Sequence, residues 1–197
     1  MNIPNAISFA RILAVPLGVW LILSESMEAA FWVFLIAAIS DGVDGFIAKR
    51  FNMVTKFGSY LDPIADKALL VSIYLALGAG GYIPVWLVIL VVFRDLLIVG
   101  GALFYQTIAL NLSMAPLMVS KINTVMQMAY GGTALAAYAF NWNITPLLQA
   151  ASVGVAMTTI VSGTLYVRIW SQKASEMENG YMKNHKPANP VNKDTKP

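Results

Sequence analysis

The sequence contains no cysteine, only one histidine and few charged residues, which make up 12% of its 197 positions. Without cysteine the chain has no disulfide framework, no thiolate metal site and no thiol nucleophile. Soluble domains are about 25% charged and roughly 45–50% apolar, whereas 58% of this chain is hydrophobic. The shortage of charge therefore predicts an integral membrane protein of one domain, embedded in a lipid bilayer.

The charged residues that are present do not favour nucleic acid as a partner. The formal net charge is only +3, and lysine and arginine form no long basic run. Binding along a nucleic acid depends on many lysine and arginine contacts to phosphates. We therefore expect no nucleic-acid partner.

Six apolar segments are long enough to cross a bilayer, which takes about 20 residues as a helix. Apolar runs of this length are typical of helices and exclude strands. They lie at residues 5–23, 28–44, 58–81, 84–105, 119–140 and 144–170. The sequence therefore predicts an all-α integral membrane bundle of six transmembrane helices, formed by residues 1–170.

The composition changes after Trp170. Residues 171–197 are rich in lysine, asparagine, proline and glutamate and contain almost no aliphatic side chain. Such a segment cannot bury enough apolar surface to fold. We expect a disordered cytoplasmic tail over residues 171–197, in which the single histidine, His185, is solvated.

The basic residues gather on one side of the predicted bundle. An even number of membrane crossings puts both termini on the same side, together with Lys49, Arg50 and Lys56 in the second connection. The opposite connections carry Glu25 and Glu28 and no lysine or arginine. Because positive residues remain on the cytoplasmic side, we expect cytoplasmic termini in a bacterial-type inner or cell membrane.

Four aspartates interrupt the apolar sequence between residues 41 and 66. Asp41 and Asp44 are three positions apart, and Asp62 and Asp66 are four apart, so each pair shares one face of a helix. Charged groups within a membrane cost about 2.5–3.5 kcal/mol each and mark functional sites. Carboxylate oxygens suit Mg²⁺, Mn²⁺ or Ca²⁺. The spacing therefore predicts a cage of carboxylates for divalent cations at the cytoplasmic end.

Two other interpretations of the aspartates were weighed. Each could pair with a nearby base, drawn from Lys49, Arg50, Lys56 and Lys67, but such pairing accounts for one or two of the four. A cation transporter or channel would need polar groups through the full depth of the membrane. The acidic residues instead lie near one face, which favours a catalytic site.

Segment 41–66 carries the pattern Asp41-x-x-Asp44-Gly45-x-x-Ala48-Lys49, followed after eight residues by Gly58-x-x-x-Asp62-x-x-x-Asp66. This pattern resembles the signature of the CDP-alcohol phosphatidyltransferases. Lys49 stands where that family has arginine, and lysine lacks the planar fork that binds phosphate through two bonds. We therefore expect Arg50 to share the role of Lys49.

The resemblance implies a reaction and a set of roles. A phosphatidyl group would move from CDP-diacylglycerol to an alcohol, releasing CMP, with two divalent cations, Mg²⁺ or Mn²⁺, as cofactors. It implies that Asp41, Asp44, Asp62 and Asp66 hold the metals and that Asp66 is also the general base. It also implies a homodimer of six-helix protomers.

Further residues are assigned to the donor by the same resemblance. The nucleotide pocket would be lined by Gly45, Ala48, Lys49 and Gly58. The opening Ile3-Pro4-Asn5, followed by Ser8-x-x-Arg11, is similar to the glycerophospholipid branch of the family, which adds Asn5 to the donor site.

Four basic residues predict an acceptor that carries phosphate, since charge-assisted bonds recognise phosphate strongly. They are Arg11, Arg50, Arg94 and Lys121. The acceptor would be glycerol 3-phosphate, giving phosphatidylglycerophosphate, or phosphatidylglycerol, giving cardiolipin. Inositol phosphate, serine and choline are alternatives. Arg94 could instead form a structural pair with Asp95.

The sequence leaves the choice between the two glycerol-type acceptors open. Arg94-Asp95 and the segment Ser120-Lys121-Ile122-Asn123-Thr124 resemble the CMP-forming cardiolipin synthases of the family. The opening stretch is similar to both branches. We therefore predict synthesis of a glycerol-type anionic phospholipid without assigning one acceptor.

Overall fold

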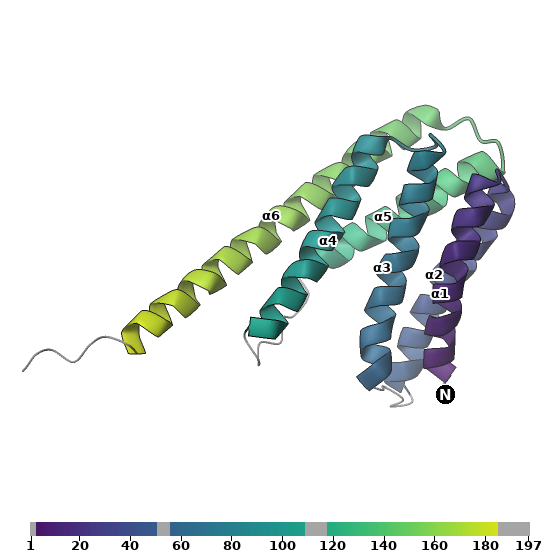
Figure 1. Cartoon of the computed structure of the whole chain (residues 1–197). Helices are drawn as coiled ribbons and strands as arrows, with labels where there is room; N and C mark the ends of the chain where they lie inside the picture. Colours follow the sequence, from purple (N-terminus) through teal and green to yellow (C-terminus); the bar gives the residue numbers. More distant parts are fainter. Residues whose placement is uncertain (1–2, 51–55, 109–117, 185–197) are drawn as a thin grey trace, which may run out of the picture. The chain divides into compact units, whose positions relative to one another are not determined.

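The computed structural model describes residues 3–50, 56–108 and 118–184 of the chain (Figure 1). Side chains are described for fewer residues, and those of residues 41–50, 56–64 and 66 lie outside the described set. All four predicted metal ligands fall within this gap. Their backbone is described and is helical.

Six helices account for nearly all of the described residues, and none of these residues forms a strand. They are α1 (Ile3–Leu23), α2 (Met27–Arg50), α3 (Lys56–Ala79), α4 (Val85–Ile108), α5 (Met118–Ala139) and α6 (Thr145–Asn184). The predicted all-α class and the six helical segments are confirmed. Each helix begins within a few residues of its predicted start.

The last helix differs from the prediction. α6 continues to Asn184, so residues 171–184 are helical where a disordered tail was expected. Extending an existing helix adds one hydrogen bond for each residue fixed and needs no new nucleus. The segment also contains good helix formers such as Lys173, Ala174 and Met177. The remaining tail, with His185, lies outside the described residues.

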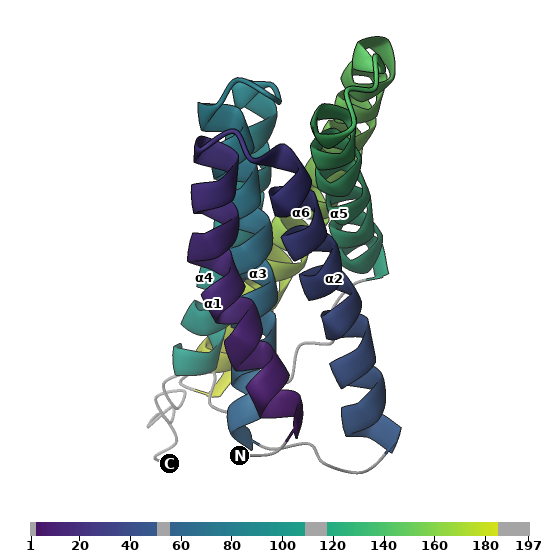
Figure 2. The same cartoon turned by 90° about the vertical axis from the view of Figure 1, so that its right-hand side faces the viewer.

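The chain divides into two compact units, residues 1–163 and 164–197. In the first unit, α1 packs against α2 and α3, α2 against α5, and α3 against α4 and α5 (Figures 1 and 2). Successive helices run in opposite directions, as short connections require. The second unit is the end of α6, where Tyr166 and Trp170 make an edge-to-face contact with ring centroids 5.9 Å apart.

The centre of the first unit is a stripe of apolar residues on α3. Leu69, Ile73 and Leu77 are four positions apart and at most 2% exposed, so they lie on one helix face. Leu87 and Val91 of α4 show the same spacing and are fully buried. These two stripes explain why α3 contacts three other helices.

The outward faces are also apolar. Ile89, Phe93 and Leu96 of α4 follow helical spacing and are 63–64% exposed. Extended exposed apolar surface is typical of proteins that contact lipid or a partner. One described helical stretch, Thr145–Gln172, is long and apolar enough to cross a membrane. Shorter apolar stretches occur at Phe9–Leu23, Met27–Ser40 and Lys67–Ala79, so six complete membrane crossings stay a prediction.

Close packing of α3 against α4 depends on Gly78. A Cβ atom added there would lie 2.7 Å from Cγ2 of Val88, a stiff β-branched side chain. We expect Gly78→Ala to lower the free energy of unfolding by about 1–3 kcal/mol. The matched control is Gly100→Ala in α4, where an added Cβ meets nothing within 4 Å. Thermal unfolding in detergent should show a lower midpoint for the first variant only, and equal midpoints would contradict the packing argument.

Candidate functional site: two aspartate pairs and a buried charge network

The aspartate pairs lie on two successive helices. Asp41 and Asp44 belong to the C-terminal part of α2, and Asp62 and Asp66 to the N-terminal part of α3. Both helix ends lie at the same end of the first unit, where α1 also begins (Figure 1). The helical backbone confirms that each pair shares one helix face. Convergence of the two pairs stays a prediction, because these side chains are outside the described set.

The predicted donor residues cannot be placed beyond their helices. Asn5 lies in α1, Gly45, Ala48 and Lys49 in α2, and Gly58 in α3. Their side-chain positions fall outside the described residues, as does the side chain of Arg50 in α2.

Three of the predicted acceptor residues have described side chains. Arg11 of α1 is only 3% exposed, as is Arg94 of α4. Lys121 of α5 is exposed. The two arginines are therefore inside the protein, where a cation needs a negative or strongly polar neighbour.

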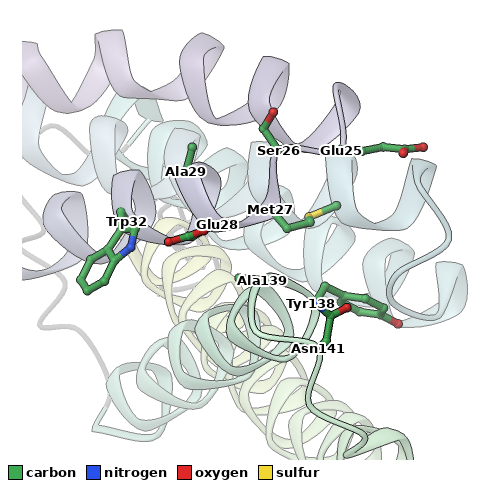
Figure 3. A pocket seen from close by; sticks show the side chains of 9 residues that line it. All are labelled: Glu25, Ser26, Met27, Glu28, Ala29, Trp32, Tyr138, Ala139 and Asn141. Atoms are coloured by element: carbon green, nitrogen blue, oxygen red, sulfur yellow. The ribbon is translucent and has the colours of Figure 1, made fainter.

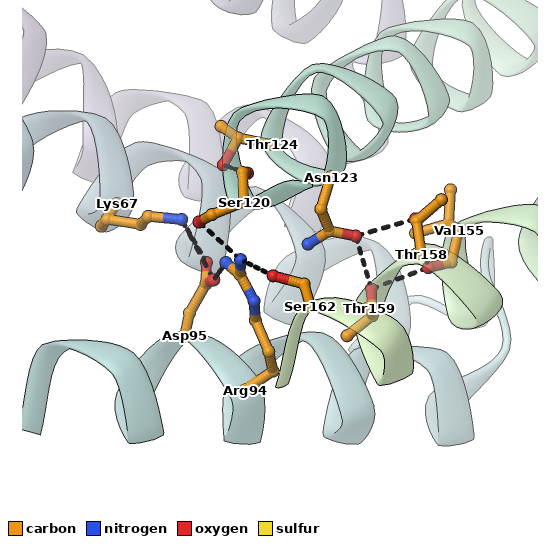
Figure 4. Close-up of polar contacts among 10 residues, drawn as sticks. All are labelled: Lys67, Arg94, Asp95, Ser120, Asn123, Thr124, Val155, Thr158, Thr159 and Ser162. Carbon is orange, nitrogen blue, oxygen red and sulfur yellow. Dashed lines mark hydrogen bonds and ion pairs between the residues drawn. The ribbon is translucent and has the colours of Figure 1, made fainter. Parts of the chain in front are cut away.

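Arg94 belongs to a buried charge network (Figure 4). Its Nη1 donates to Oδ1 of Asp95 at 2.6 Å. Asp95 is 2% exposed and also accepts bonds from the Lys67 ammonium, 3.0 Å from each carboxylate oxygen. One carboxylate thus binds two cations and joins α3 to α4. The pair of Arg94 with Asp95, weighed above as an alternative, is observed.

The second guanidinium nitrogen of Arg94 reaches two further helices. Nη2 donates to the hydroxyl oxygens of Ser120 in α5, at 2.7 Å, and of Ser162 in α6 (Figure 4). Both terminal nitrogens of Arg94 are therefore engaged by the protein itself. Phosphate binding by Arg94 stays a prediction, and it would require one of these bonds to be exchanged.

A second polar cluster joins α5 to α6. The amide oxygen of Asn123, which is fully buried, lies 2.8 Å from the hydroxyl oxygen of Thr158 and 3.0 Å from that of Thr159. Nearby, the Tyr74 hydroxyl of α3 donates to the backbone carbonyl of Gln127 at 2.9 Å. These contacts place buried polar groups of α3, α5 and α6 inside the helix bundle.

Gln127 differs from Asn123 because, among the described residues, neither polar atom of its side-chain amide has a hydrogen-bond partner, although the residue is fully buried. A buried polar group without a partner costs about 1–3 kcal/mol. We expect Gln127→Met to raise the free energy of unfolding by about that amount. Asn123→Leu is the matched control and should lower it, because it removes bonds to two threonines. A loss of stability in Gln127→Met would contradict this interpretation.

A cavity among the described residues lies away from these polar clusters. It measures about 720 Å³ and is formed around the α1–α2 turn and the end of α5 (Figure 3). Glu25 and Glu28 line it together with Trp32 and Tyr138, and no lysine or arginine with a described side chain does. Two carboxylates repel phosphate groups. This cavity therefore does not suit a phosphate-bearing substrate, and Arg11, Arg94 and Lys121, the predicted site residues with described side chains, do not line it.

Sequence reasoning missed the central place of Lys67 in the charge network. It treated Lys67 only as a partner for the four aspartates, and its actual partner, Asp95, is 28 positions away. The signal available was a lysine next to Asp66 and an aspartate in the middle of an apolar helix. Intramembrane charges usually pair with one another, but the sequence does not say which ones meet.

No group of three or more histidine, cysteine, aspartate or glutamate side chains is suited to hold a metal among the side chains that are described. The predicted ligands Asp41, Asp44, Asp62 and Asp66 are outside that set. Their chemistry fits hard divalent cations, since all four supply carboxylate oxygens. Their helical backbone fits this role as well, because it places each pair on one face.

Comparison with known proteins identifies the class of this all-helical protein. The family model for CDP-alcohol phosphatidyltransferase matches residues 1–165, a range that includes both aspartate pairs and the buried charge network. The chain therefore belongs to the CDP-alcohol phosphatidyltransferase family, as its signature indicated.

Relatives with two different names are similar to this chain. CDP-diacylglycerol--glycerol-3-phosphate 3-phosphatidyltransferase 1, chloroplastic, from Oryza sativa subsp. japonica is 35% identical, covering 84% of this chain and 56% of the plant protein. Cardiolipin synthase (CMP-forming) from Rattus norvegicus is 33% identical, covering 84% of this chain and 60% of the rat protein. CDP-diacylglycerol--glycerol-3-phosphate 3-phosphatidyltransferase from Bacillus subtilis (strain 168) is 31% identical, covering 84% of this chain and 93% of the bacterial protein.

The length shared with this chain differs among these relatives. The chain spans less than two thirds of the length of the plant and rat proteins. It spans nearly the whole bacterial protein. The family membership rests on the shared region, residues 1–165.

Proposed function

We propose that this protein is a membrane phosphatidyltransferase that moves a phosphatidyl group from CDP-diacylglycerol to a glycerol-type acceptor and releases CMP. The observation that carries this proposal is the family match over residues 1–165, which contains the complete aspartate signature. The names of the plant, rat and bacterial relatives support it, because each describes a transfer of this kind or its product.

The aspartates are the residues proposed to act on the donor. Two divalent cations, Mg²⁺ or Mn²⁺, would be held by Asp41, Asp44, Asp62 and Asp66. Bound cations would neutralise charge on the donor pyrophosphate, as in other phosphoryl transfers. Lys49 and Arg50 add positive charge beside the phosphates, and Gly45 and Gly58 leave space for the nucleotide.

Asp66 is proposed to take the proton of the acceptor. The acceptor hydroxyl oxygen attacks the phosphorus of the phosphatidyl group, and the bond from that phosphorus to the CMP oxygen breaks. CMP leaves with the bonding electrons, and the Asp66 carboxylate holds the proton that the hydroxyl loses. The atoms and charges balance without a further reactant.

The fold supports a membrane location for this chemistry. Exposed apolar faces on α4 and the apolar stretch Thr145–Gln172 suit contact with lipid. In the proposed arrangement six helices cross the membrane, with the aspartate-bearing helix ends facing the cytoplasm, where a nucleotide-activated lipid is available. Two protomers would form the homodimer that the family resemblance implies.

The acceptor is proposed to be glycerol 3-phosphate or phosphatidylglycerol. The plant relative is named for glycerol 3-phosphate and the rat relative for cardiolipin, and they are 35% and 33% identical to this chain. Both acceptors carry phosphate, and the buried cations Arg11 and Arg94 could bind it. Acceptors such as inositol phosphate, serine or choline are second candidates, and a cation transporter is the remote one.

An acceptor panel tests this proposal. Purified full-length protein would receive CDP-diacylglycerol and Mg²⁺ or Mn²⁺ with each acceptor in turn. We expect CMP release with glycerol 3-phosphate or with phosphatidylglycerol, and mass spectrometry of the lipid product identifies which. CMP release only with inositol phosphate, serine or choline would overturn the glycerol branch. Cation flux into liposomes without CMP release would favour the transporter.

A further inference from the structure

Among the described side chains, the buried charge network holds more positive than negative charge. Arg94 and Lys67 each form an ion pair with Asp95. Asp95 can neutralise only one of the two cations. An excess charge in a protein interior is costly unless an anion accompanies it. The network is therefore suited to receive an anion.

The two cations differ in how well they can reach a ligand. Arg94 is 3% exposed, and its terminal nitrogens are bound to Asp95, Ser120 and Ser162. The Lys67 side chain is 27% exposed. Lys67 is thus the member of the network that an incoming molecule can touch, and Arg94 is held in the interior.

Among the described side chains, the ammonium group of Lys67 bonds only to Asp95, which leaves it a further donor. It has three N–H groups, and the two oxygens of Asp95 engage at most two of them. The third can point away from Asp95. Lys67 directly follows Asp66 in α3, so this donor belongs to the same turn of helix as the proposed general base.

From these observations we propose that Lys67 binds a phosphate oxygen of a substrate, while Asp95 and Arg94 fix its ammonium group in place. This proposal rests on the proposed function, because both substrates of that reaction carry phosphate. Asp95 is then a positioning residue, since it acts through Lys67. The ligand chemistry is an anionic phosphate ester, which the donor pyrophosphate or the acceptor phosphate could supply.

Steady-state kinetics of three variants test the proposal. Lys67→Gln removes the charge, Lys67→Arg keeps it, and Arg168→Gln removes an equal charge from an exposed position in the second unit. Because a charge-assisted bond is lost, we expect Lys67→Gln to raise one KM about ten- to hundredfold. Lys67→Arg should recover most of this loss, and Arg168→Gln should behave as the wild type. Unchanged thermal midpoints would show that the variants fold.

The substrate whose KM rises identifies the source of the phosphate. A higher KM for CDP-diacylglycerol assigns Lys67 to the donor, and a higher KM for the acceptor assigns it to the acceptor. A change in KM of up to about twofold is well below the effect of losing one charge-assisted bond. If neither KM of Lys67→Gln changes by more than this, Lys67 is only structural and the proposal is overturned.

Binding measurements keep the test independent of turnover. Calorimetry with CDP and with glycerol 3-phosphate, in the presence of Mg²⁺, compares the wild type with Lys67→Gln. Weaker binding of either ligand by the variant supports the proposal, and equal binding of both overturns it. If the wild type released no CMP, the proposed function would be contradicted. The comparison of affinities would still show whether Lys67 binds phosphate.

Discussion

Replacing Asp66 by asparagine is expected to reduce CMP release by about two to four orders of magnitude, the usual contribution of a general base. Asparagine keeps the size of the side chain and one oxygen that can bind a metal, but it cannot accept the proton of the acceptor hydroxyl. Binding of CDP-diacylglycerol in the presence of Mg²⁺ or Mn²⁺ should therefore persist. Single-turnover CMP release, with a separate measurement of CDP binding, distinguishes these two effects.

A matched variant controls for loss of a carboxylate as such. Glu28→Gln neutralises an exposed residue at the α1–α2 turn, at the opposite end of the first unit from the aspartates (Figure 1). Its CMP release should equal that of the wild type. Normal turnover in Asp66→Asn would contradict the assignment of Asp66 as the base, whatever its contribution to metal binding.

Replacing Asp95 by asparagine is expected to have the largest effect on stability. The change would leave Lys67 and Arg94, the latter 3% exposed, without the carboxylate that both now bind. Breaking a buried ion pair by removing one partner costs about 3–5 kcal/mol. Thermal unfolding in detergent and denaturant titration should both show this loss.

The companion variant Arg94→Met should be less harmful. In that variant Asp95 keeps its bonds to Lys67, so its charge stays compensated, and the apolar side chain avoids burying a new polar group. The expected order of stability is wild type, then Arg94→Met, then Asp95→Asn. A reversed order of the two variants would show that Asp95 is not the centre of the network.

The helices could be predicted from the sequence because long apolar runs specify them locally. The end of α6 could not, since the composition of residues 171–184 describes poor burial but does not forbid a helix that continues from Trp170. Absence of a buried face and absence of a helix are different properties. A segment with good helix formers can be helical without burying a face.

The aspartate pairs could be found from sequence because their spacing and their cost in an apolar helix both appear in the chain itself. The partners of Lys67 and Arg94 could not, because they depend on how α3, α4, α5 and α6 pack. Arg94 has an aspartate beside it in sequence, and this neighbour proved to be its partner. Ser162, by contrast, is 68 positions away, and no local pattern indicates that contact.

In the proposed function, the signature aspartates bind the metals that transfer from CDP-diacylglycerol requires. The most direct measurement is CMP release by the purified full-length protein, with CDP-diacylglycerol and a glycerol-type acceptor, before and after removal of divalent cations by a chelator. We expect CMP release to stop with chelation, to return with Mg²⁺ or Mn²⁺, and to be lost in Asp41→Ala. Release that continues undiminished in the chelator, or in Asp41→Ala, would contradict this expectation.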